Sequence, residues 1–108
     1  METREQFAAT LGAIASVPRL AILTEVLGGE VHVSELARRL SMSRALLYMH
    51  LAKLEAGRFI RTRLILSPEG NALKLVALED FDLRITPEFI GGLIEMAPST
   101  NEGETNDA

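Results

Sequence analysis

The sequence predicts a mainly α domain with one β-hairpin, in the α+β class. Only 5% of the 108 residues are aromatic and none is Trp, so the core must be built mainly from Leu, Ile, Val and Ala, which favours helices. Apolar residues recur at helical spacing as far as Gly57 and then alternate with the period of two that is typical of a strand. The length allows one domain, because domains usually contain roughly 50 to 250 residues.

The first helix is expected to begin after Thr3. Thr3 and Gln6 have the spacing of a capping box, in which the two side chains bond to each other's backbone N–H groups. Phe7, Leu11 and Ile14 then recur on one face. This pattern predicts an amphipathic helix with one apolar side.

A second helix is expected to open near Ser16 or Val17. Pro18 falls in its first turn, where a missing N–H group costs nothing. The Gly28-Gly29 pair is expected to end the helix. Its apolar side is expected to consist of Leu20, Leu23 and Leu27.

A short strand and a third helix are expected next. Residues 30–33 are suited to a brief strand because they include two β-branched valines. Ser34 is expected to cap a helix that runs to Leu40.

The segment Ser41-Met42-Ser43 is expected to form a three-residue turn. Ser43 can cap the helix that follows, which is expected to end near Gly57. The core face of this helix is predicted to carry Leu47, Leu51 and Leu54.

A β-hairpin is predicted after Gly57. Residues 60–66 and 72–78 read as two antiparallel strands, and residues 67–71 have the composition of a turn. On the first strand one face is expected to carry Ile60, Thr62, Leu64 and Leu66, and the other Arg61, Arg63 and Ile65.

The last part of the chain is expected to hold a linker, a helix and a tail. Residues 79–84 read as an acidic connector, and Thr86-Pro87-Glu88 has the residues expected at the start of a helix. Pro98 is expected to stop this helix. We therefore assign residues 1–97 to the domain and residues 98–108 to a disordered acidic tail.

The predicted elements combine into a winged helix-turn-helix, with a two-stranded β-hairpin wing and flanking N- and C-terminal helices. In this arrangement the second helix of the pair fits the major groove of double-stranded DNA, and the hairpin reaches the neighbouring backbone. Although the chain has a net charge of −4, residues 34–63 hold seven basic and two acidic residues, a local charge of +5. The basic segment therefore coincides with the predicted DNA-binding elements.

Three segments resemble the ArsR-type winged-helix transcriptional regulators. They are Val17-Pro18-Arg19-Leu20-Ala21-Ile22-Leu23, Val33-Ser34-Glu35-Leu36-Ala37, and Ser43-Arg44 with His50-Leu51-Ala52-Lys53-Leu54-Glu55. The likeness covers about residues 10 to 80. It implies a homodimeric DNA-binding repressor or activator, with recognition residues near the start of the helix at about residues 43–56.

The chain departs from the metal-sensing members of that family. Those members carry two cysteines in the segment that here runs from Glu30 to Ala37, and His32 and Ser34 stand at these positions. A thiolate site is therefore missing, and His32 alone cannot complete a tetrahedral site. We expect no metal and no cofactor, with His32 at the surface or at a strand edge; a metal site elsewhere has no support in the sequence.

The candidate DNA contacts lie on the second helix of the pair, at about residues 43–56, and on the wing, at about residues 60–78. They are Ser41, Ser43, Arg44, Ala45, Tyr48, Arg61, Arg63 and Lys74. Arg44 is the best candidate for a base contact, because its guanidinium can bond guanine through two hydrogen bonds; the alternatives are a phosphate contact or a solvated side chain. Tyr48 could contact phosphate or a thymine methyl, or lie partly buried under the wing. Met49 and His50 are expected to pack on the helical core.

The wing arginines allow two interpretations. Arg61 and Arg63 lie two residues apart on one strand face and could hold adjacent phosphates. Basic residues also keep an exposed hairpin from pairing with other strands. Arg38 and Arg39 are explained by their position in the last turn of a helix, with phosphate contact as an additional possibility.

The terminal helices carry more apolar residues than a domain of this size can cover. A homodimer interface is the expected use, and a single enlarged monomer core is the alternative. The candidate interface residues are Phe7, Leu11, Ile14, Phe89, Ile90, Leu93 and Ile94, with Met96 beside them.

Other functions find little support in the sequence. There is no cysteine, no Gly-rich phosphate loop and no nucleophile motif, so an enzyme is not expected. The longest stretch without a charge, residues 6–18, is too short to span a bilayer, and we expect a cytoplasmic protein that associates with the nucleoid when bound to DNA. The effector, if any, is unknown. The competing function is a winged-helix module that binds a protein instead of DNA.

Overall fold

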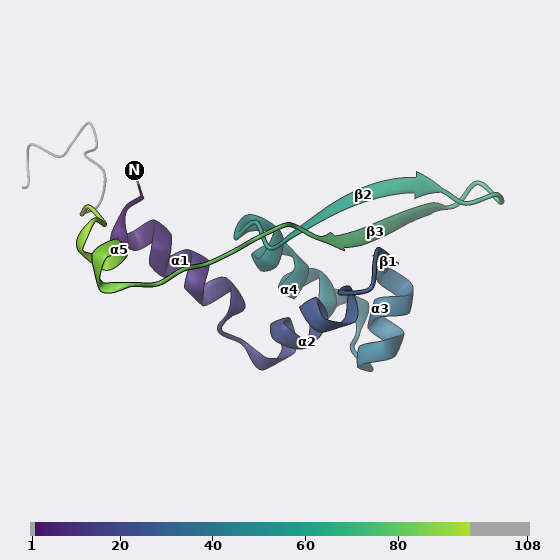
Figure 1. Cartoon of the computed structure of the whole chain (residues 1–108). Helices are drawn as coiled ribbons and strands as arrows, with labels where there is room; N and C mark the ends of the chain where they lie inside the picture. The colour runs from purple at the N-terminus through teal and green to yellow at the C-terminus, as the bar shows by residue number, and fades with distance from the viewer. Residues whose placement is uncertain (1, 96–108) are drawn as a thin grey trace, which may run out of the picture.

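The computed structural model describes residues 2–95. Within that range the chain forms five helices and a three-stranded antiparallel sheet, which confirms the predicted α+β class and the wing (Figure 1). The elements follow the order α1 (Arg4–Ile14), α2 (Val17–Glu25), β1 (Val31–His32), α3 (Val33–Leu40), α4 (Arg44–Ala56), β2 (Ile60–Leu66), β3 (Ala72–Leu78) and α5 (Pro87–Gly91). Met96, the expected helix stop at Pro98 and the expected tail at 98–108 lie outside the described residues.

Four helices begin where the sequence predicts, at a Ser or Thr whose side chain accepts a backbone hydrogen bond. These residues are Thr3 on α1, Ser16 on α2, Ser43 on α4 and Thr86 on α5. On α1 the full capping box is present: the Gln6 N–H donates to Thr3 Oγ1 at 3.0 Å, and the Thr3 N–H donates to Gln6 Oε1 at 2.9 Å.

The predicted cap of α3 is wrong. The Glu35 N–H donates to the Nδ1 atom of His32 at 3.3 Å, so His32 is the capping residue and Ser34 lies inside the helix. The reason is tertiary: His32 is still paired with Leu75 of β3, so the backbone stays extended up to His32 and the helix starts immediately after it.

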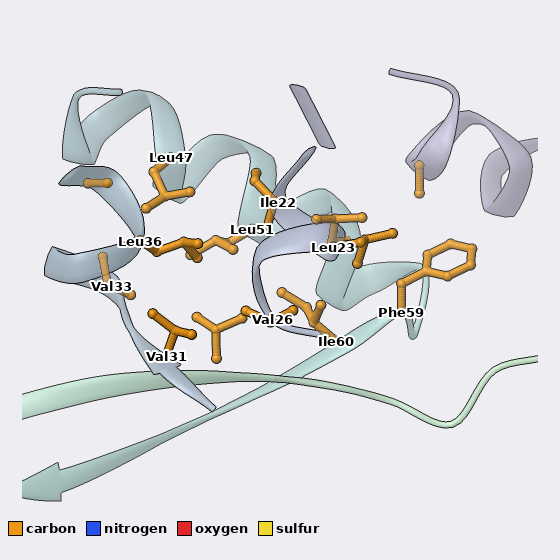
Figure 2. Packing of buried hydrophobic residues seen from close by; sticks show 14 residues of the cluster. Ile22, Leu23, Val26, Val31, Val33, Leu36, Leu47, Leu51, Phe59 and Ile60 are labelled. Carbon is orange, nitrogen blue, oxygen red and sulfur yellow. The ribbon is translucent and has the colours of Figure 1, made fainter. Parts of the chain in front are cut away.

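The predicted apolar side of α2 is partly wrong. Leu23 is buried, but Leu20 and Leu27 are 50% and 70% exposed. The core positions are instead filled by Ile22 and Val26; Figure 2 shows Ile22 near Leu51 of α4, and Val26 near Ile60 at the base of the sheet. The helix also ends earlier than expected, at Glu25. Spacing alone allowed either face, and packing against the neighbouring helices selects the Ile22 face.

The main core lies between helices α2, α3 and α4 and the base of the sheet (Figure 2). Leu47, Leu51 and Leu54 are at most 1% exposed, which confirms the predicted core face of α4. Phe59 and Ile60, where the chain leaves α4 and enters β2, are equally buried. The core therefore holds α4 and the root of the wing in one rigid unit.

The wing hairpin has the two predicted antiparallel strands, and they pair from Ile60 opposite Leu78 to Leu66 opposite Ala72. The short strand predicted at residues 30–33 is present as β1, which confirms it. It pairs with β3 as a third strand of the sheet, through Val31 and His32, and this pairing was not predicted. Beyond this anchored base the hairpin extends away from the helices (Figure 1), and Leu64 and Leu66 near its tip are 70% and 73% exposed.

The predicted acidic connector after β3 also has an apolar side. Phe81, Leu83 and Ile85 alternate with polar residues along an extended backbone, and their side chains are 39% to 53% exposed. The Phe81 ring packs edge-on against Phe59, with centroids 4.9 Å apart. This segment leads the chain from the wing back across the molecule to the N-terminal helix (Figure 1).

The last described helix, α5, lies beside the start of α1 (Figure 1). The prediction that it runs to Pro98 is wrong: it ends at Gly91, because Gly92 caps it and Ile94 then pairs with the N-terminal segment. The Phe89 and Phe7 rings pack edge-on with centroids 4.8 Å apart, and the Arg4 N–H donates to the Ile94 carbonyl at 2.8 Å. Phe7 is buried by this contact but does not belong to the main core cluster. The two terminal segments thus pack on each other at one end of the molecule.

Candidate nucleic-acid interface

The turn between α3 and α4 exposes the start of α4. Ser41 adopts a left-handed conformation with φ 51°, and its N–H donates to the carbonyls of Ala37 and Arg38 at the end of α3. Ser43 then caps α4 by accepting from the Leu46 N–H at 3.1 Å. Arg44 and Ala45 in the first turn are exposed. The three-residue turn is as predicted, and it leaves the positive end of the α4 dipole open to solvent.

A groove of about 600 Å³ separates α4 from the wing, and we call it the α4–wing groove. It is lined by Arg44, Tyr48, Thr62, Arg63, Leu64, Ala72 and Lys74. Four of these lining residues were predicted as DNA contacts: Arg44, Tyr48, Arg63 and Lys74. They lie up to 30 residues apart in the sequence, and the fold brings them to one surface.

Two basic residues of the α4–wing groove, Arg44 and Lys74, make no ion pair with a carboxylate among residues 2–95. The Lys74 ammonium lies 5.2 Å from the centroid of the Tyr48 ring, within the range of a cation–π interaction. Tyr48 is 38% exposed, so it supports Lys74 and still faces solvent. The groove therefore presents two cations available to an anionic partner.

The wing arginines contact acidic residues of the protein itself. Arg63 donates two hydrogen bonds of 2.8 Å to the Glu30 carboxylate, and these bonds hold the pKa of Glu30 below its usual value. Arg61 donates to the Leu78 carbonyl at 2.6 Å and lies 3.4 Å from Glu79, outside the groove lining. The two side chains thus have separate partners and do not form a free pair.

Arg38 and Arg39 are also neutralised within the fold. Hydrogen bonds from Arg38, and then from Arg39, lower the pKa of Glu35 to about 2. Arg39 also lies 3.6 Å from Glu25, which ties α3 to α2. The charge of +5 in residues 34–63 therefore overstates the field at the surface, and the unpaired cations decide where an anion can bind.

His50 and Met49, the two residues of α4 expected to pack on the helical core, differ in burial. His50 is partly buried, and its Nδ1 atom lies 3.0 Å from an Arg19 guanidinium nitrogen. Burial, followed by the charges of Arg19 and Lys53, lowers the pKa of His50. Met49 is 59% exposed, so the prediction of its burial is wrong. Position 49 faces outward because Leu47 and Leu51 occupy the buried face of α4.

Sequence reasoning missed the role of Glu30. Glu30 and Arg63 are 33 residues apart, so no local spacing indicates that they pair. Their contact depends on β1 joining β3 at the base of the wing, which places the residue before β1 near β2. Thr62, which lines the groove and donates to Glu55 at 3.1 Å, was also missed.

The residues of the terminal helices that were predicted to form a dimer interface fall into two groups by exposure. Phe7 is only 6% exposed because it packs on Phe89, and Leu11 and Ile14 are partly buried. The α5 region is more open: Phe89, Ile90 and Ile94 are 36% to 48% exposed, and Leu93 is partly buried.

The part of the chain described, residues 2–95, holds no group of three or more His, Cys, Asp or Glu residues that could bind a metal. No single helix in this range is long and apolar enough to cross a membrane; α1 and α2 reach that length and hydropathy only together, and they bend by 71° where they meet.

The family model for bacterial regulatory proteins of the ArsR family matches residues 16–62. Among solved structures, reduced HlyU from Vibrio cholerae N16961 is 30% identical, with 70% of this chain and 75% of HlyU aligned at a TM-score of 0.59. NolR from Sinorhizobium fredii is 29% identical, with 70% and 71% of the two chains aligned at a TM-score of 0.59. A homodimeric winged helix-turn-helix DNA-binding domain from Mycobacterium bovis shares the fold, at 23% identity, 68% and 64% coverage and a TM-score of 0.58. A search of curated proteins gave no match.

Proposed function

Because the chain belongs to the ArsR family of bacterial regulatory proteins, we propose that it is a homodimer that recognises a specific double-stranded DNA sequence. The family and the fold are those of DNA-binding transcriptional regulators and not of enzymes. In this proposal α4 enters the major groove, the wing follows the adjacent backbone, and the protein acts in the cytoplasm, on the nucleoid.

The α4–wing groove is the observation that carries the DNA-binding proposal. Arg44 lies in the first exposed turn of α4, where the helix dipole favours a phosphate and where side chains can reach base edges. Lys74 lies across the groove on β3, free to contact a phosphate of the neighbouring backbone. One surface can thus supply both a base contact and a phosphate contact.

The proposed dimer rests on the exposed apolar side chains between residues 81 and 94. Six large ones are 36% to 53% exposed: Phe81, Leu83, Ile85, Phe89, Ile90 and Ile94. A run of this size in a small chain is typical of an interface. To bind two half-sites one helical turn apart, a two-fold dimer formed here has to place its two copies of α4 about 34 to 36 Å apart.

Selection of bound duplexes from random DNA tests the proposed function directly. We expect enrichment of a palindromic site whose half-sites are about 10 base pairs apart, centre to centre. Retention of random duplex DNA is expected to fall as salt rises, because phosphate contacts release counterions. If no sequence is enriched and no salt-dependent retention occurs, the protein-binding module becomes the better explanation.

Two substitutions of Ser43, the residue that caps α4, distinguish an effect on stability from an effect on DNA binding. Ser43→Ala is expected to lower the free energy of unfolding by about 1 kcal/mol, because it removes the bond to the Leu46 N–H. Ser43→Asp keeps a capping oxygen, so stability is expected to be unchanged, while the added charge weakens DNA binding. Denaturant unfolding and duplex titration measure the two effects. Unchanged DNA affinity in Ser43→Asp would mean that DNA does not approach the start of α4.

Glu30 is expected to compete with DNA for Arg63. Glu30→Gln removes the charge that neutralises Arg63, so affinity for every duplex should rise and the slope of log affinity against log salt should steepen by about one unit. Glu5→Gln is the matched control: it removes the same charge from the exposed face of α1, where Glu5 makes no ion pair with another described residue. Equal effects of the two variants would leave only a general charge effect and remove Arg63 from the interface.

A further inference from the structure

A second groove, of about 820 Å³, lies between α1 and the C-terminal end of α4, and we call it the α1–α4 groove. One wall is formed by residues of α1 that include Gln6 and Thr10. The other wall includes Lys53 and Arg58, and Arg19 at the start of α2 also lines the groove. The groove is at the opposite end of α4 from Arg44, so it is separate from the candidate nucleic-acid interface.

The α1–α4 groove concentrates positive charge. Three basic residues, Arg19, Lys53 and Arg58, line it, against one carboxylate, Glu2. None of the three forms an ion pair with another residue in the range 2–95, whereas Arg4, Arg38, Arg39, Arg61 and Arg63 all do. Within the described residues the groove is thus a basic surface that no carboxylate pairs with, separate from the α4–wing groove.

Arg58 adopts a backbone conformation that its residue type disfavours. Its φ is 66°, in the left-handed region, at the position after α4 where Gly is usual. The Phe59 N–H donates to the Leu54 carbonyl and the Arg58 N–H to the Glu55 carbonyl, which is the hydrogen-bond pattern of a Schellman motif. Backbone strain of this kind is often retained where the side chain has a function.

Gly57, the residue before Arg58, cannot be replaced by a residue with a side chain. Gly57 has an ordinary helical φ of −80°, but a Cβ atom there would lie 2.9 Å from the Ala13 side chain and 2.9 Å from the Phe59 ring. Position 57 therefore requires Gly for close packing. At position 58 only the left-handed backbone conformation favours Gly. The residue there is an arginine, and it lines the α1–α4 groove.

Arg19 is held in place before any ligand binds. Its Nε–H group donates to the Ala13 carbonyl at 2.6 Å, and a second nitrogen donates to the Gly12 carbonyl at 3.3 Å. A third contact, of 3.0 Å, joins it to His50 on α4. A fixed cation loses little side-chain entropy on binding an anion. The contact with His50 also joins Arg19, and with it the α1–α4 groove, to α4.

We propose that the α1–α4 groove binds a small organic anion, through a carboxylate or phosphate group held by Arg58, Lys53 and Arg19. The volume is within the range of about 300 to 1,000 Å³ that ligand pockets usually have, which leaves room for an organic body beyond a single anionic group. The wall residues Gln6 and Thr10 offer hydrogen bonds to that body.

Backbone amide NMR of the full chain tests this site without DNA. Citrate and glucose 6-phosphate are the probes for the two anionic groups, and glucose is the uncharged control. We expect saturable shifts with at least one anion, centred on the amides of Gly12, Ala13, Gly57 and Arg58, and none with glucose.

Arg58→Gly is the decisive variant. Gly suits the left-handed position, so the melting temperature is expected to rise by several degrees, while anion affinity falls by about tenfold or more through loss of one charged hydrogen-bond donor. Arg84→Gln, which removes an exposed arginine outside the groove, should leave anion affinity unchanged.

Three results would overturn the proposal: no saturable shift with either anion at millimolar concentration, shifts confined to the amides around Arg44 and Lys74, or equal affinity in the wild type and Arg58→Gly. A failure of DNA binding would not affect any of these measurements, so the two proposals are tested separately.

Discussion

Ile90→Asp is expected to convert the protein from a dimer to a monomer of 11.8 kDa. Ile90 is 48% exposed on α5, so an aspartate there remains solvated in the monomer but would be buried and unpaired in the proposed interface. Loss of the dimer also separates the two DNA-binding surfaces, so affinity for a palindromic duplex should fall by about 10²- to 10⁴-fold, the usual gain from joining two binding modules.

Light scattering at tens of micromolar and duplex titration measure this prediction. Leu27→Asp is the control, because Leu27 is 70% exposed in the turn that follows α2, and α2 lies away from α5 (Figure 1). It should leave both the mass and the affinity unchanged. Phe89→Asp is less informative, since Phe89 also packs on Phe7 within one chain. A monomeric wild type, or a dimer that survives Ile90→Asp, would contradict the proposed interface.

Arg44→Ala is expected to remove discrimination at one base-pair position, by about 1 to 3 kcal/mol, which is the contribution of a guanidinium bonded to a guanine by two hydrogen bonds. The fold should tolerate the change, because Arg44 is exposed and makes no ion pair with another described residue. Affinity for the selected duplex should fall towards that for a scrambled one.

Lys74→Ala is the matched comparison, since Lys74 lies in the same groove but on the wing. It is expected to weaken both duplexes equally and to lower the salt slope by about one unit, as the loss of one phosphate contact does. Titration of both duplexes at several salt concentrations distinguishes the two signatures. Loss of preference in Lys74→Ala, with uniform weakening in Arg44→Ala, would reverse the assigned roles.

The candidate nucleic-acid interface could be predicted from the sequence where it depends on local contacts. Ser43 as a helix cap, with Leu47 and Leu51 as core residues, places Arg44 on an exposed surface. The alternation of the wing places Lys74 on its second strand, where it is partly buried. These features depend on contacts within a few residues, which spacing reveals. The ion pair of Arg63 with Glu30 could not be predicted in this way, because it joins residues 33 apart.

By itself, the sequence determined the order of the helices and the hairpin, because capping residues, glycines and apolar periods act over one or two turns of chain. Only the tertiary structure decided which face of α2 is buried, that His32 caps α3, and that β1 extends the wing to a three-stranded sheet. It also decided which arginines pair with a carboxylate, as Arg61 does with Glu79 and Arg63 with Glu30. Those contacts join residues distant in sequence, and their energies depend on packing that no local pattern records.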